Sequence, residues 1–383
     1  MTAPPPARYS TGSWRRENVW SRMASRSIAT RRTCRRLRAP SAISARPACR
    51  AGETWACWID GRSGTSRALS DFPRVAAALA LLVLSGLALA GCAGNGVSLA
   101  PAATLGQQGG EAADSRRQLW LVPSAQPGVP MRAYLYRPPG PGPFRLAIVA
   151  HGSEQDARLR AAMAMPRFDA LTAWLVERGY AVLLPQRPGH GETGGPYLED
   201  QGGCASADFR AAGLAVADSI AAAVGFMAAQ PFVEKTGVVV VGHSAGGWGA
   251  LALASRNPAQ VAAIVNFSGG RGGHDRNRPL QNCAPERLVA AAGEFGRTAR
   301  LPTLWLYAAN DTYFPPELSG RMAEAYRRAG GRVEYRLLPA VAGDGHALIQ
   351  TEGAAAAWKP YLERFLAVAQ PRQSPVSRPR PAG

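Results

Sequence analysis

Four consecutive valines, residues 238–241, run directly into the sequence Gly-His-Ser-Ala-Gly at 242–246. A short, continuous run of β-branched residues predicts a strand that is buried on both faces. The residues that follow, 247–251, are predicted to begin a helix. This order holds Ser244 on a sharp, strained turn with its hydroxyl exposed at the end of a strand. The chain must therefore adopt a fold that contains such a strand–turn–helix unit.

Glycine at positions 242 and 246 has a steric reason. A strained turn brings its neighbours so close that a Cβ atom at either position would clash with the adjoining strand or helix. The N-terminus of the following helix favours a negative charge that develops beside Ser244. The motif by itself is common in a chain with 42 glycines, but the valine run before it makes it specific. Ser244 is therefore predicted to be a nucleophile.

Apolar runs alternate with helical stretches from Gln118 onward. The first two runs surround a Pro-Gly turn and predict an antiparallel hairpin, and the later ones are continuous enough for a sheet that is covered on both faces. The β-α-β-α order predicts an α/β fold: one mostly parallel central sheet with helices on both faces. The expected strands are 119–122, 132–137, 146–150, 181–185, 238–241, 262–267, 303–307 and 333–338, and the expected crossover helices include 168–178 and 207–229.

A serine hydroxyl needs a base, and the chain has five histidines. Only His346 follows the last expected strand, and Asp311 comes shortly after the strand 303–307. In this order of Ser, Asp and His the chain resembles the α/β-hydrolases. The resemblance implies that His346 removes the proton of Ser244 and that Asp311 orients the imidazole. We favour Asp311 over Asp344, which is only two residues from His346 and is typical of a polar turn.

An oxyanion needs two backbone N–H donors. One is expected from Ala245, the residue after the nucleophile. The other is expected from the loop His-Gly-Ser that follows the strand 146–150, with Ser153 as the candidate donor and Gly152 as the alternative.

Two further residues are candidates for substrate contact. Trp248 lies beside the serine turn, where it is expected to belong to the core or the pocket wall, with a specific substrate contact as the alternative. His274 ends the glycine-rich segment 269–274, which follows a strand and is therefore expected to face the substrate.

The segment from about 117 to 369 resembles the dienelactone-hydrolase-like branch of the α/β-hydrolases. Its loop 186–195 is similar to the Arg-Gly-His-Gly-x-Ser segment of many such enzymes, with Pro188 as the departure. The resemblance implies a serine esterase that forms an acyl-enzyme and needs no cofactor. The enzymes that gave the branch its name use Cys where this chain has Ser244, so dienelactone is not the expected substrate.

The segment between Phe267 and Thr303 contains no long insertion that would form a large lid. The expected partner is therefore a small or medium acyl substrate. No metal site and no obligate protein partner are predicted. A peptidase or amidase of the prolyl-oligopeptidase-like type is the alternative, although no propeller repeat is visible. A non-catalytic binding protein on a hydrolase scaffold is a further alternative. The loss of the Ser, the acid or the His would favour it, and all three are present.

The N-terminal part has a different composition. Residues 1–70 mix Arg, Ser, Pro and Ala without a sustained apolar period and are predicted to be disordered. The uncharged run 75–90 is short for a membrane span but fits a secretory signal. Its end, Leu-Ala-Gly-Cys, resembles a bacterial lipobox, which implies a lipid on Cys92 and a membrane anchor. A transmembrane anchor is the alternative, and either would place the domain outside the cytoplasmic membrane.

A signal normally begins close to the start of translation, so the true start is expected near residue 70 rather than at Met1. The expected organisation is a leader at 1–70, a lipoprotein signal at 71–91, a flexible tether at 92–116, a hydrolase domain at 117–369 and a disordered tail at 370–383.

The basic charge of the chain is concentrated in the leader. Fifteen arginines before Val75 oppose four acidic residues, which leaves about +11 of the formal net charge of +18 in that segment. A basic chain favours nucleic-acid binding when the charge forms a patch with interleaved aromatic residues. The rest of the chain lacks such a stripe, so no nucleic-acid partner is predicted.

Two cysteines, Cys204 and Cys283, remain in the predicted exported part. Both are expected near the ends of strands, and thiols in an oxidising compartment tend to pair. We predict a disulfide between them, with two buried free thiols as the alternative.

Overall fold

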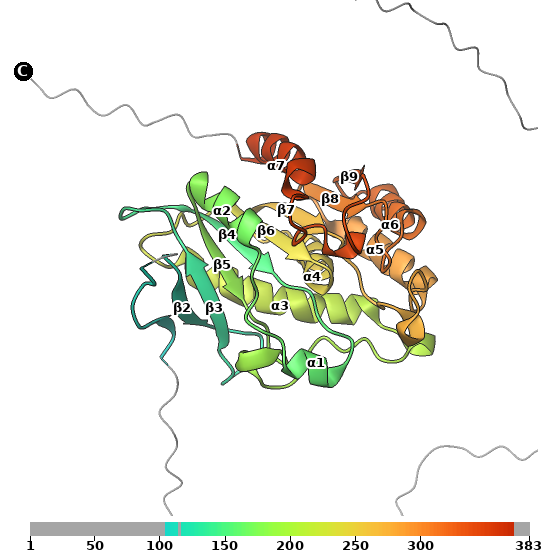
Figure 1. Cartoon of the computed structure of the whole chain (residues 1–383), viewed down its shortest axis with the longest axis horizontal. Helices are drawn as coiled ribbons and strands as arrows, with labels where there is room; N and C mark the ends of the chain where they lie inside the picture. Colours follow the sequence, from blue (N-terminus) through green and yellow to red (C-terminus); the bar gives the residue numbers. More distant parts are fainter. Residues whose placement is uncertain (1–103, 114–115, 371–383) are drawn as a thin grey trace, which may run out of the picture. The chain divides into compact units, whose positions relative to one another are not determined.

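The computed structural model describes residues 104–113 and 116–370. The predicted leader, the signal segment and Cys92 lie outside the described residues, as does the tail 371–383. Within the described part, the central element is one nine-stranded sheet with the strand order β1-β2-β3-β5-β4-β6-β7-β8-β9 (Figure 1).

The sheet is mixed but mostly parallel, as predicted. Three strands at one edge are antiparallel to their neighbours: β1 (Gly106–Gln108), β2 (Gln118–Val122) and β3 (Met131–Tyr136). The other six pair in parallel: β4 (Arg145–Ala150), β5 (Tyr180–Pro185), β6 (Val238–His243), β7 (Val261–Phe267), β8 (Thr303–Ala308) and β9 (Val333–Leu338).

Strand β1 was not expected. It lies within 92–116, the segment predicted to be a flexible tether, and it pairs antiparallel with β2. Its sequence, Gly-Gln-Gln, has no apolar alternation. Backbone hydrogen bonds to an exposed edge strand hold it instead, and these do not depend on side-chain type.

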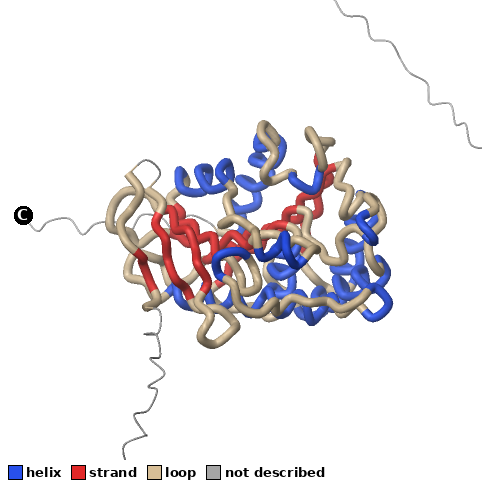
Figure 2. Tube along the Cα trace, turned by 60° about the horizontal axis from the view of Figure 1, so that its bottom comes forward, coloured by secondary structure: helices blue, strands red, loops and turns tan. Residues whose placement is uncertain are grey.

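Helices cover both faces of the sheet (Figure 2). The helices α3 (Phe209–Ala228), α4 (Ala245–Ala254), α5 (Pro285–Thr298) and α6 (Pro316–Arg328) contribute to the core on one face. The helices α2 (Asp169–Glu177) and α7 (Ala355–Ala369) contribute to the core on the other face. A short helix, α1 (Ala157–Ala161), and four 3₁₀ turns complete the described part: η1 (Gly191–Thr193), η2 (Cys204–Ser206), η3 (Asp275–Asn277) and η4 (Gly345–Ala347).

The valine run explains why two cores form. Successive side chains of a strand point to opposite faces, so Val238 and Val240 belong to the core beneath α3 and α4. Val239 and Val241 belong to the core beneath α2 and α7. All four side chains are fully buried. A continuous apolar run is what a strand needs when both of its faces are covered.

Two helices illustrate how apolar this interior is. Helix α3 is long and apolar enough to cross a membrane by composition, but in this fold it packs against α4 and the sheet. Among the described residues, it is the one helix that meets those criteria. Helix α4 is buried along its whole length.

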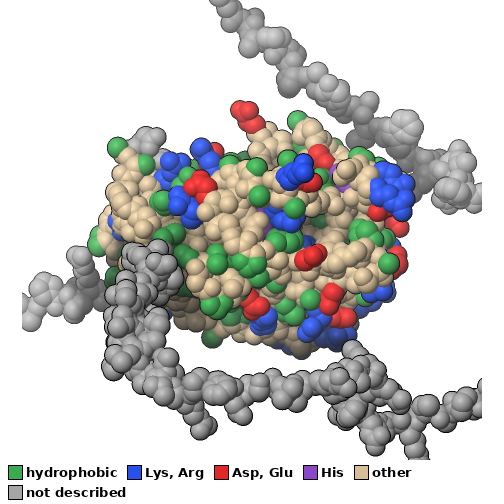
Figure 3. Space-filling view, turned by 90° about the horizontal axis from the view of Figure 1, so that it is seen from below, with side chains coloured by type: hydrophobic (Ala, Val, Ile, Leu, Met, Phe, Trp, Pro, Cys, Tyr) green, Lys and Arg blue, Asp and Glu red, His purple; other side chains and the backbone are tan. Residues whose placement is uncertain are grey.

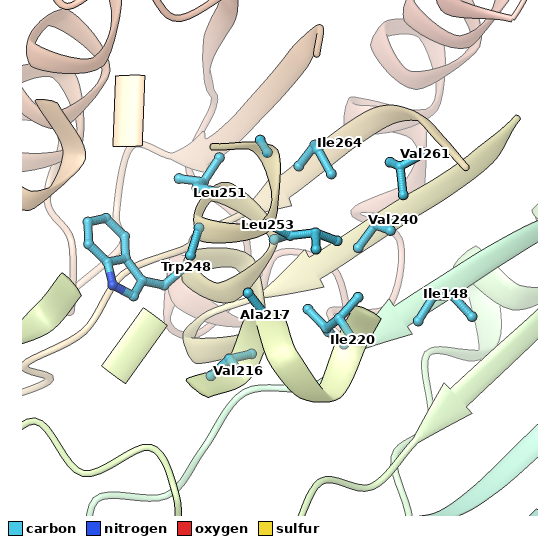
Figure 4. Close-up of a cluster of buried hydrophobic side chains, with 14 of the residues drawn as sticks. Ile148, Val216, Ala217, Ile220, Val240, Trp248, Leu251, Leu253, Val261 and Ile264 are labelled. Carbon is cyan, nitrogen blue, oxygen red and sulfur yellow. The ribbon is translucent and has the colours of Figure 1, made fainter. Parts of the chain in front are cut away.

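Trp248 was expected in the core or the pocket wall, and it lies in the core; the alternative of a specific substrate contact is wrong. Its side chain is fully buried in α4, within the core shown in Figure 4. Its indole N–H donates to the carbonyl of Phe209 at 2.7 Å, and its ring packs against Phe295 with ring centroids 5.0 Å apart. Both contacts are made with residues of α3 and α5, so the side chain fills the space between these helices.

The predicted disulfide is confirmed. Cys204 and Cys283 are bonded, and their Cα atoms lie 5.3 Å apart. The bond ties the 3₁₀ turn before α3 to the loop before α5 across 79 positions of sequence.

On the face shown in Figure 3, acidic and basic side chains are interspersed over the surface.

Candidate active site

Ser244 lies where β6 ends and α4 begins. Its backbone has φ 53° and ψ −121°, a left-handed φ that a non-glycine residue adopts only under strain. A Cβ atom on Gly242 would overlap the carbonyl of Gly246, and one on Gly246 would overlap the carbonyl of Ala150. The two glycines therefore allow the turn for the steric reason expected from the sequence.

The structure brings Ser244, His346 and Asp311 together. Ser244 Oγ lies 3.0 Å from Nε2 of His346, and Nδ1 of His346 lies 3.3 Å and 3.4 Å from the two carboxylate oxygens of Asp311. A carboxylate accepts but does not donate, so Nδ1 carries the proton in this arrangement and Nε2 accepts from the serine hydroxyl. These three residues come from three separate loops, after β6, β8 and β9.

Asp311 is fully buried, and its position is held by the backbone of its own loop. Its Oδ1 atom accepts hydrogen bonds from the amides of Tyr313 and Phe314, each at 2.9 Å. These donors leave the carboxylate directed at His346. Hydrogen bonds to a charged carboxylate are among the stronger ones in proteins.

Asp344, the alternative acid, has a different position. Its Oδ1 atom accepts from the amides of His346 at 2.9 Å and Thr312 at 3.1 Å, and the Thr312 hydroxyl donates to Oδ2. Burial alone would raise the pKa of Asp344, but these hydrogen bonds outweigh it and hold the pKa below its ordinary value. Asp344 therefore caps the turn that carries His346 and joins it to the loop of Asp311.

His243 joins the serine turn to the histidine loop. Its Nε2 atom lies 2.9 Å from the carbonyl oxygen of His346 and donates to it. Burial, and then repulsion from His346, lowers the pKa of His243 to about 4. His243 is consequently neutral near pH 7, which suits a position next to a histidine that must accept a proton.

An aromatic stack lies against the imidazole of His346. The ring of Tyr313 is stacked on it, with centroids 4.2 Å apart and planes 26° apart. His274 stacks on Tyr313 in turn, at 3.7 Å and 21°, and its Nε2 atom lies 3.1 Å from the carbonyl of Thr312. His274 thus lines the larger of the cavities at Ser244, and much of its ring contacts protein; its contact with a substrate stays a prediction. Tyr313 was missed, although its place two residues after Asp311 could have indicated it.

The expected oxyanion donors lie beside Ser244. Ala245 is the first residue of α4, so its N–H has no partner within the helix. Gly152 lies so close to Ser244 that a Cβ atom on Gly152 would be 3.1 Å from Cβ of Ser244. Ser153 and Ala245 both line a cavity that reaches Ser244. The Ser153 hydroxyl lies 2.9 Å from Nε2 of His190, which fixes this loop.

A buried cluster of two arginines and one glutamate contacts the loop that carries Ser153. The guanidinium of Arg187 pairs with Glu199 and also donates to the carbonyl of His151 at 2.7 Å. Arg271 contacts Glu199 from the other side, at 3.4 Å. Burial would raise the pKa of Glu199, but the charge of Arg187 outweighs it and the pKa lies at about 2. No spacing in the sequence indicated that Glu199 and Arg271 would meet.

Two cavities open on either side of Ser244, one of about 250 Å³ and one of about 780 Å³. Both are lined by Ser244 and Tyr313, and His346 lines the larger one. Among residues 104–113 and 116–370, no group of three or more His, Cys, Asp or Glu side chains could hold a metal ion.

Several solved structures of hydrolases are similar to this chain. A puromycin-hydrolyzing peptidase from Mycobacterium tuberculosis is 19% identical, with a TM-score of 0.48 over 67% of this chain. The match spans only 40% of the length of that peptidase. An acetyl xylan esterase from Paenibacillus sp. R4 is 17% identical, with a TM-score of 0.49 over 69% of this chain and 88% of that chain. An esterase from Pyrococcus furiosus is 15% identical, with a TM-score of 0.46 over 66% of this chain and 92% of that chain.

No curated protein matches the sequence significantly. The family model of the dienelactone hydrolases, in contrast, matches residues 131–368. This range covers more than half of the chain and includes the serine turn and the loops of Asp311 and His346. The protein is a hydrolase with the α/β-hydrolase fold, and it belongs to the dienelactone hydrolase family.

Proposed function

We propose that this protein is a serine esterase in which Ser244 attacks the carbonyl carbon of a carboxylic ester. The observation that carries this proposal is the continuous chain from Ser244 Oγ through the His346 imidazole to the buried carboxylate of Asp311. The strained turn exposes the hydroxyl at the head of α4, where the helix dipole favours developing negative charge. A serine becomes a useful nucleophile when an oriented base lies within this distance.

The reaction follows from these positions. As Ser244 Oγ bonds to the carbonyl carbon, its proton moves to Nε2 of His346, and the Asp311 carboxylate stabilises the imidazolium that forms. The carbonyl oxygen becomes an oxyanion that the Ala245 and Ser153 amides bind. The C–O bond to the alcohol then breaks, and His346 returns the proton to the leaving oxygen. Water, deprotonated by His346, hydrolyses the acyl-enzyme and releases the acid.

Fluorophosphonate labelling tests the nucleophile. The wild type should be labelled, and both Ser244→Ala and His346→Ala should lose the label. Ser255→Ala changes a serine at the other end of α4 and should be labelled like the wild type. Absence of label in the wild type would contradict the proposal and favour a binding protein. Chromogenic esters assayed beside aminoacyl anilides then separate an esterase from an amidase: faster cleavage of the anilides would overturn the ester assignment.

We also propose that the domain is exported and anchored to a bacterial membrane by a lipid on Cys92. The Cys204–Cys283 disulfide supports export, because disulfides persist in oxidising compartments. Incorporation of radiolabelled palmitate into the full chain, and its loss in Cys92→Ser, would support the anchor. Palmitate that remains in Cys92→Ser, or a wild type that partitions with the soluble fraction, would contradict it.

A further inference from the structure

The two cavities beside Ser244 differ in chemistry, and this difference bears on which part of an ester occupies each. They share a border made of Ser153, Glu154, Gln155, Ser244 and Tyr313. Beyond this border, each has its own lining. A substrate whose carbonyl lies at Ser244 must therefore place its acyl part on one side and its alcohol part on the other.

The smaller cavity is polar. Tyr197, Arg160 and Arg271 line it together with the carboxylates of Glu154 and Asp200. The two arginines and the two carboxylates carry equal and opposite formal charges, and the charge of the buried Glu199, which contacts Arg271, is balanced by Arg187. The Tyr197 hydroxyl accepts a hydrogen bond from Arg271 at 2.9 Å and lies 3.4 Å from the Ser153 hydroxyl. This lining suits a neutral group that forms hydrogen bonds.

The walls of the smaller cavity are held in place. The amide of Gly272 donates to the side chain of Gln201 at 3.2 Å, which joins two of its walls. The Cys204–Cys283 disulfide ties together the same two loops. At about 250 Å³, the cavity is below the usual range of about 300–1,000 Å³ for drug-sized ligands. It therefore accepts a short group and cannot widen easily for a long one.

The larger cavity has an apolar wall along one side. This wall is formed by α1 and the segment that follows it, and the wall residues are Leu159, Met163, Ala164, Met165, Pro166 and Phe168. A volume of about 780 Å³ would hold a substantial apolar group. Burial of apolar surface on this wall would contribute to affinity in proportion to the area covered.

The position of His346 decides which part of the substrate goes where. His346 must donate its proton to the leaving oxygen, so the alcohol has to lie on its side, and His346 lines the larger cavity but not the smaller one. Ala245, whose amide is expected to bind the oxyanion, lines the smaller cavity. The carbonyl group and its acyl substituent therefore lie toward the polar side.

Building on the esterase function proposed above, we propose that the substrates are esters of a short, neutral, polar acyl group with a larger, partly apolar alcohol. The acyl group occupies the cavity lined by Tyr197, and the alcohol extends along the wall that begins at Leu159. Selectivity is thus strict for the acid and permissive for the alcohol.

Two series of esters test this orientation with the full chain. The acyl series is ethyl acetate, methoxyacetate, butanoate and hexanoate, and the alcohol series is ethyl, butyl and hexyl acetate. Methoxyacetate and butanoate have nearly the same shape, because an ether oxygen replaces one methylene. Each kcat/KM is divided by the rate constant of hydroxide hydrolysis, which removes intrinsic reactivity.

We expect methoxyacetate to be preferred over butanoate by about tenfold, since a site built for hydrogen bonds discriminates against the apolar analogue. Hexanoate should react at least about tenfold more slowly than acetate, whereas hexyl acetate should react faster than ethyl acetate. A preference for long acyl chains over long alcohols would overturn the orientation. Equal rates for methoxyacetate and butanoate would overturn the polar acyl site.

Two matched variants assign the cavities. Tyr197→Phe removes one hydroxyl and keeps the ring on which Arg160 stacks at 3.7 Å, and it should reduce the methoxyacetate preference alone. Leu159→Ala shortens the apolar wall and should reduce the hexyl preference alone. Each readout is a ratio of two rates from one preparation, so partial loss of folded protein does not change it.

Reversed effects of the two variants, or no effect of either, would overturn the assignment. If the wild type hydrolyses neither series and takes no fluorophosphonate label, the esterase function itself fails and this inference fails with it. Labelling and hydrolysis with the opposite selectivity would leave the esterase function intact and remove only the inference.

Discussion

The turn that carries Ser244 and the loops that carry Asp311 and His346 are held in place by different forces. The turn depends on backbone contacts: Gly242 and Gly246 pack where no Cβ atom fits. The two loops depend on side chains: Asp344 bonds to both, and Tyr313 stacks on His346. A steric requirement on neighbouring residues is visible in the sequence as a short motif. A side-chain network between distant loops has no such motif. The predictions below test this contrast.

The largest expected effect is that of Asp311→Asn. An Asn oxygen can still accept from the amides of Tyr313 and Phe314, which leaves the amide NH₂ facing Nδ1 of His346. The imidazole is then held in the wrong tautomer, and kcat should fall by about 10⁴-fold. Steady-state kinetics on a chromogenic ester measures this. Asp344→Asn is the matched control and should lower kcat by less than about tenfold, since Asp344 accepts from the backbone of the two loops and not from the imidazole, and an Asn oxygen can still accept from both amides. A larger loss of kcat in Asp344→Asn than in Asp311→Asn would show that Asp344, and not Asp311, is the acid that supports His346.

Gly246→Ala tests the steric side of the comparison. The new Cβ atom would overlap the carbonyl of Ala150 and shift Ser244. We expect kcat/KM to fall by about 10²-fold and unfolding free energy to fall by about 1–3 kcal/mol. Kinetics and urea unfolding measure the two effects. Gly225→Ala is the control, because Gly225 lies exposed in α3 with open space around it. It should stabilise the helix by up to about 1 kcal/mol. Equal behaviour of the two variants would refute the steric account.

Tyr313 tests the contribution of stacking. Tyr313→Ala removes the ring that lies on His346, and we expect kcat to fall by about tenfold as the imidazole loses its orientation. Tyr313→Phe keeps the ring and should retain wild-type kcat. The kcat values of the two variants on one ester decide the matter, and a loss in Tyr313→Phe equal to that in Tyr313→Ala would show that the hydroxyl, rather than the stacked ring, is needed.

His243, which bridges the two regions, gives the smallest effect. Its pKa is about 4 in the folded protein and about 6.5 when exposed, so the unfolded chain binds the proton more readily. Its contribution to stability is therefore complete above about pH 6.5 and is lost as the pH falls toward 4. Between pH 7 and 5.5, the wild type should lose about 1 kcal/mol more than His243→Gln. Urea unfolding at both pH values measures the difference, and parallel losses would contradict the lowered pKa.

Much of the fold could be predicted because its signals are local. Burial is indicated locally by the valine run and the other apolar strands, and the sharp turn is indicated by the glycines beside Ser244. The sheet and the positions of most strands follow from these signals. Strand β1 could not be predicted, because its polar sequence owes its conformation to the edge of β2. Trp248 could not be placed either, because a helix that is apolar on every side does not indicate which side faces the substrate.

By itself, the sequence determined that a serine lies on a strained turn between a buried strand and a helix, because the glycines and valines there act on their immediate neighbours. It also supplied one histidine and one acid in the right order. The tertiary structure alone decided that Asp344 joins the loops of Asp311 and His346, that Glu199 lies between Arg187 and Arg271, and that Ser244 borders both a polar cavity and a larger one with an apolar wall. These features depend on side chains from loops far apart in sequence, which meet only because parallel strands end at one edge of the sheet.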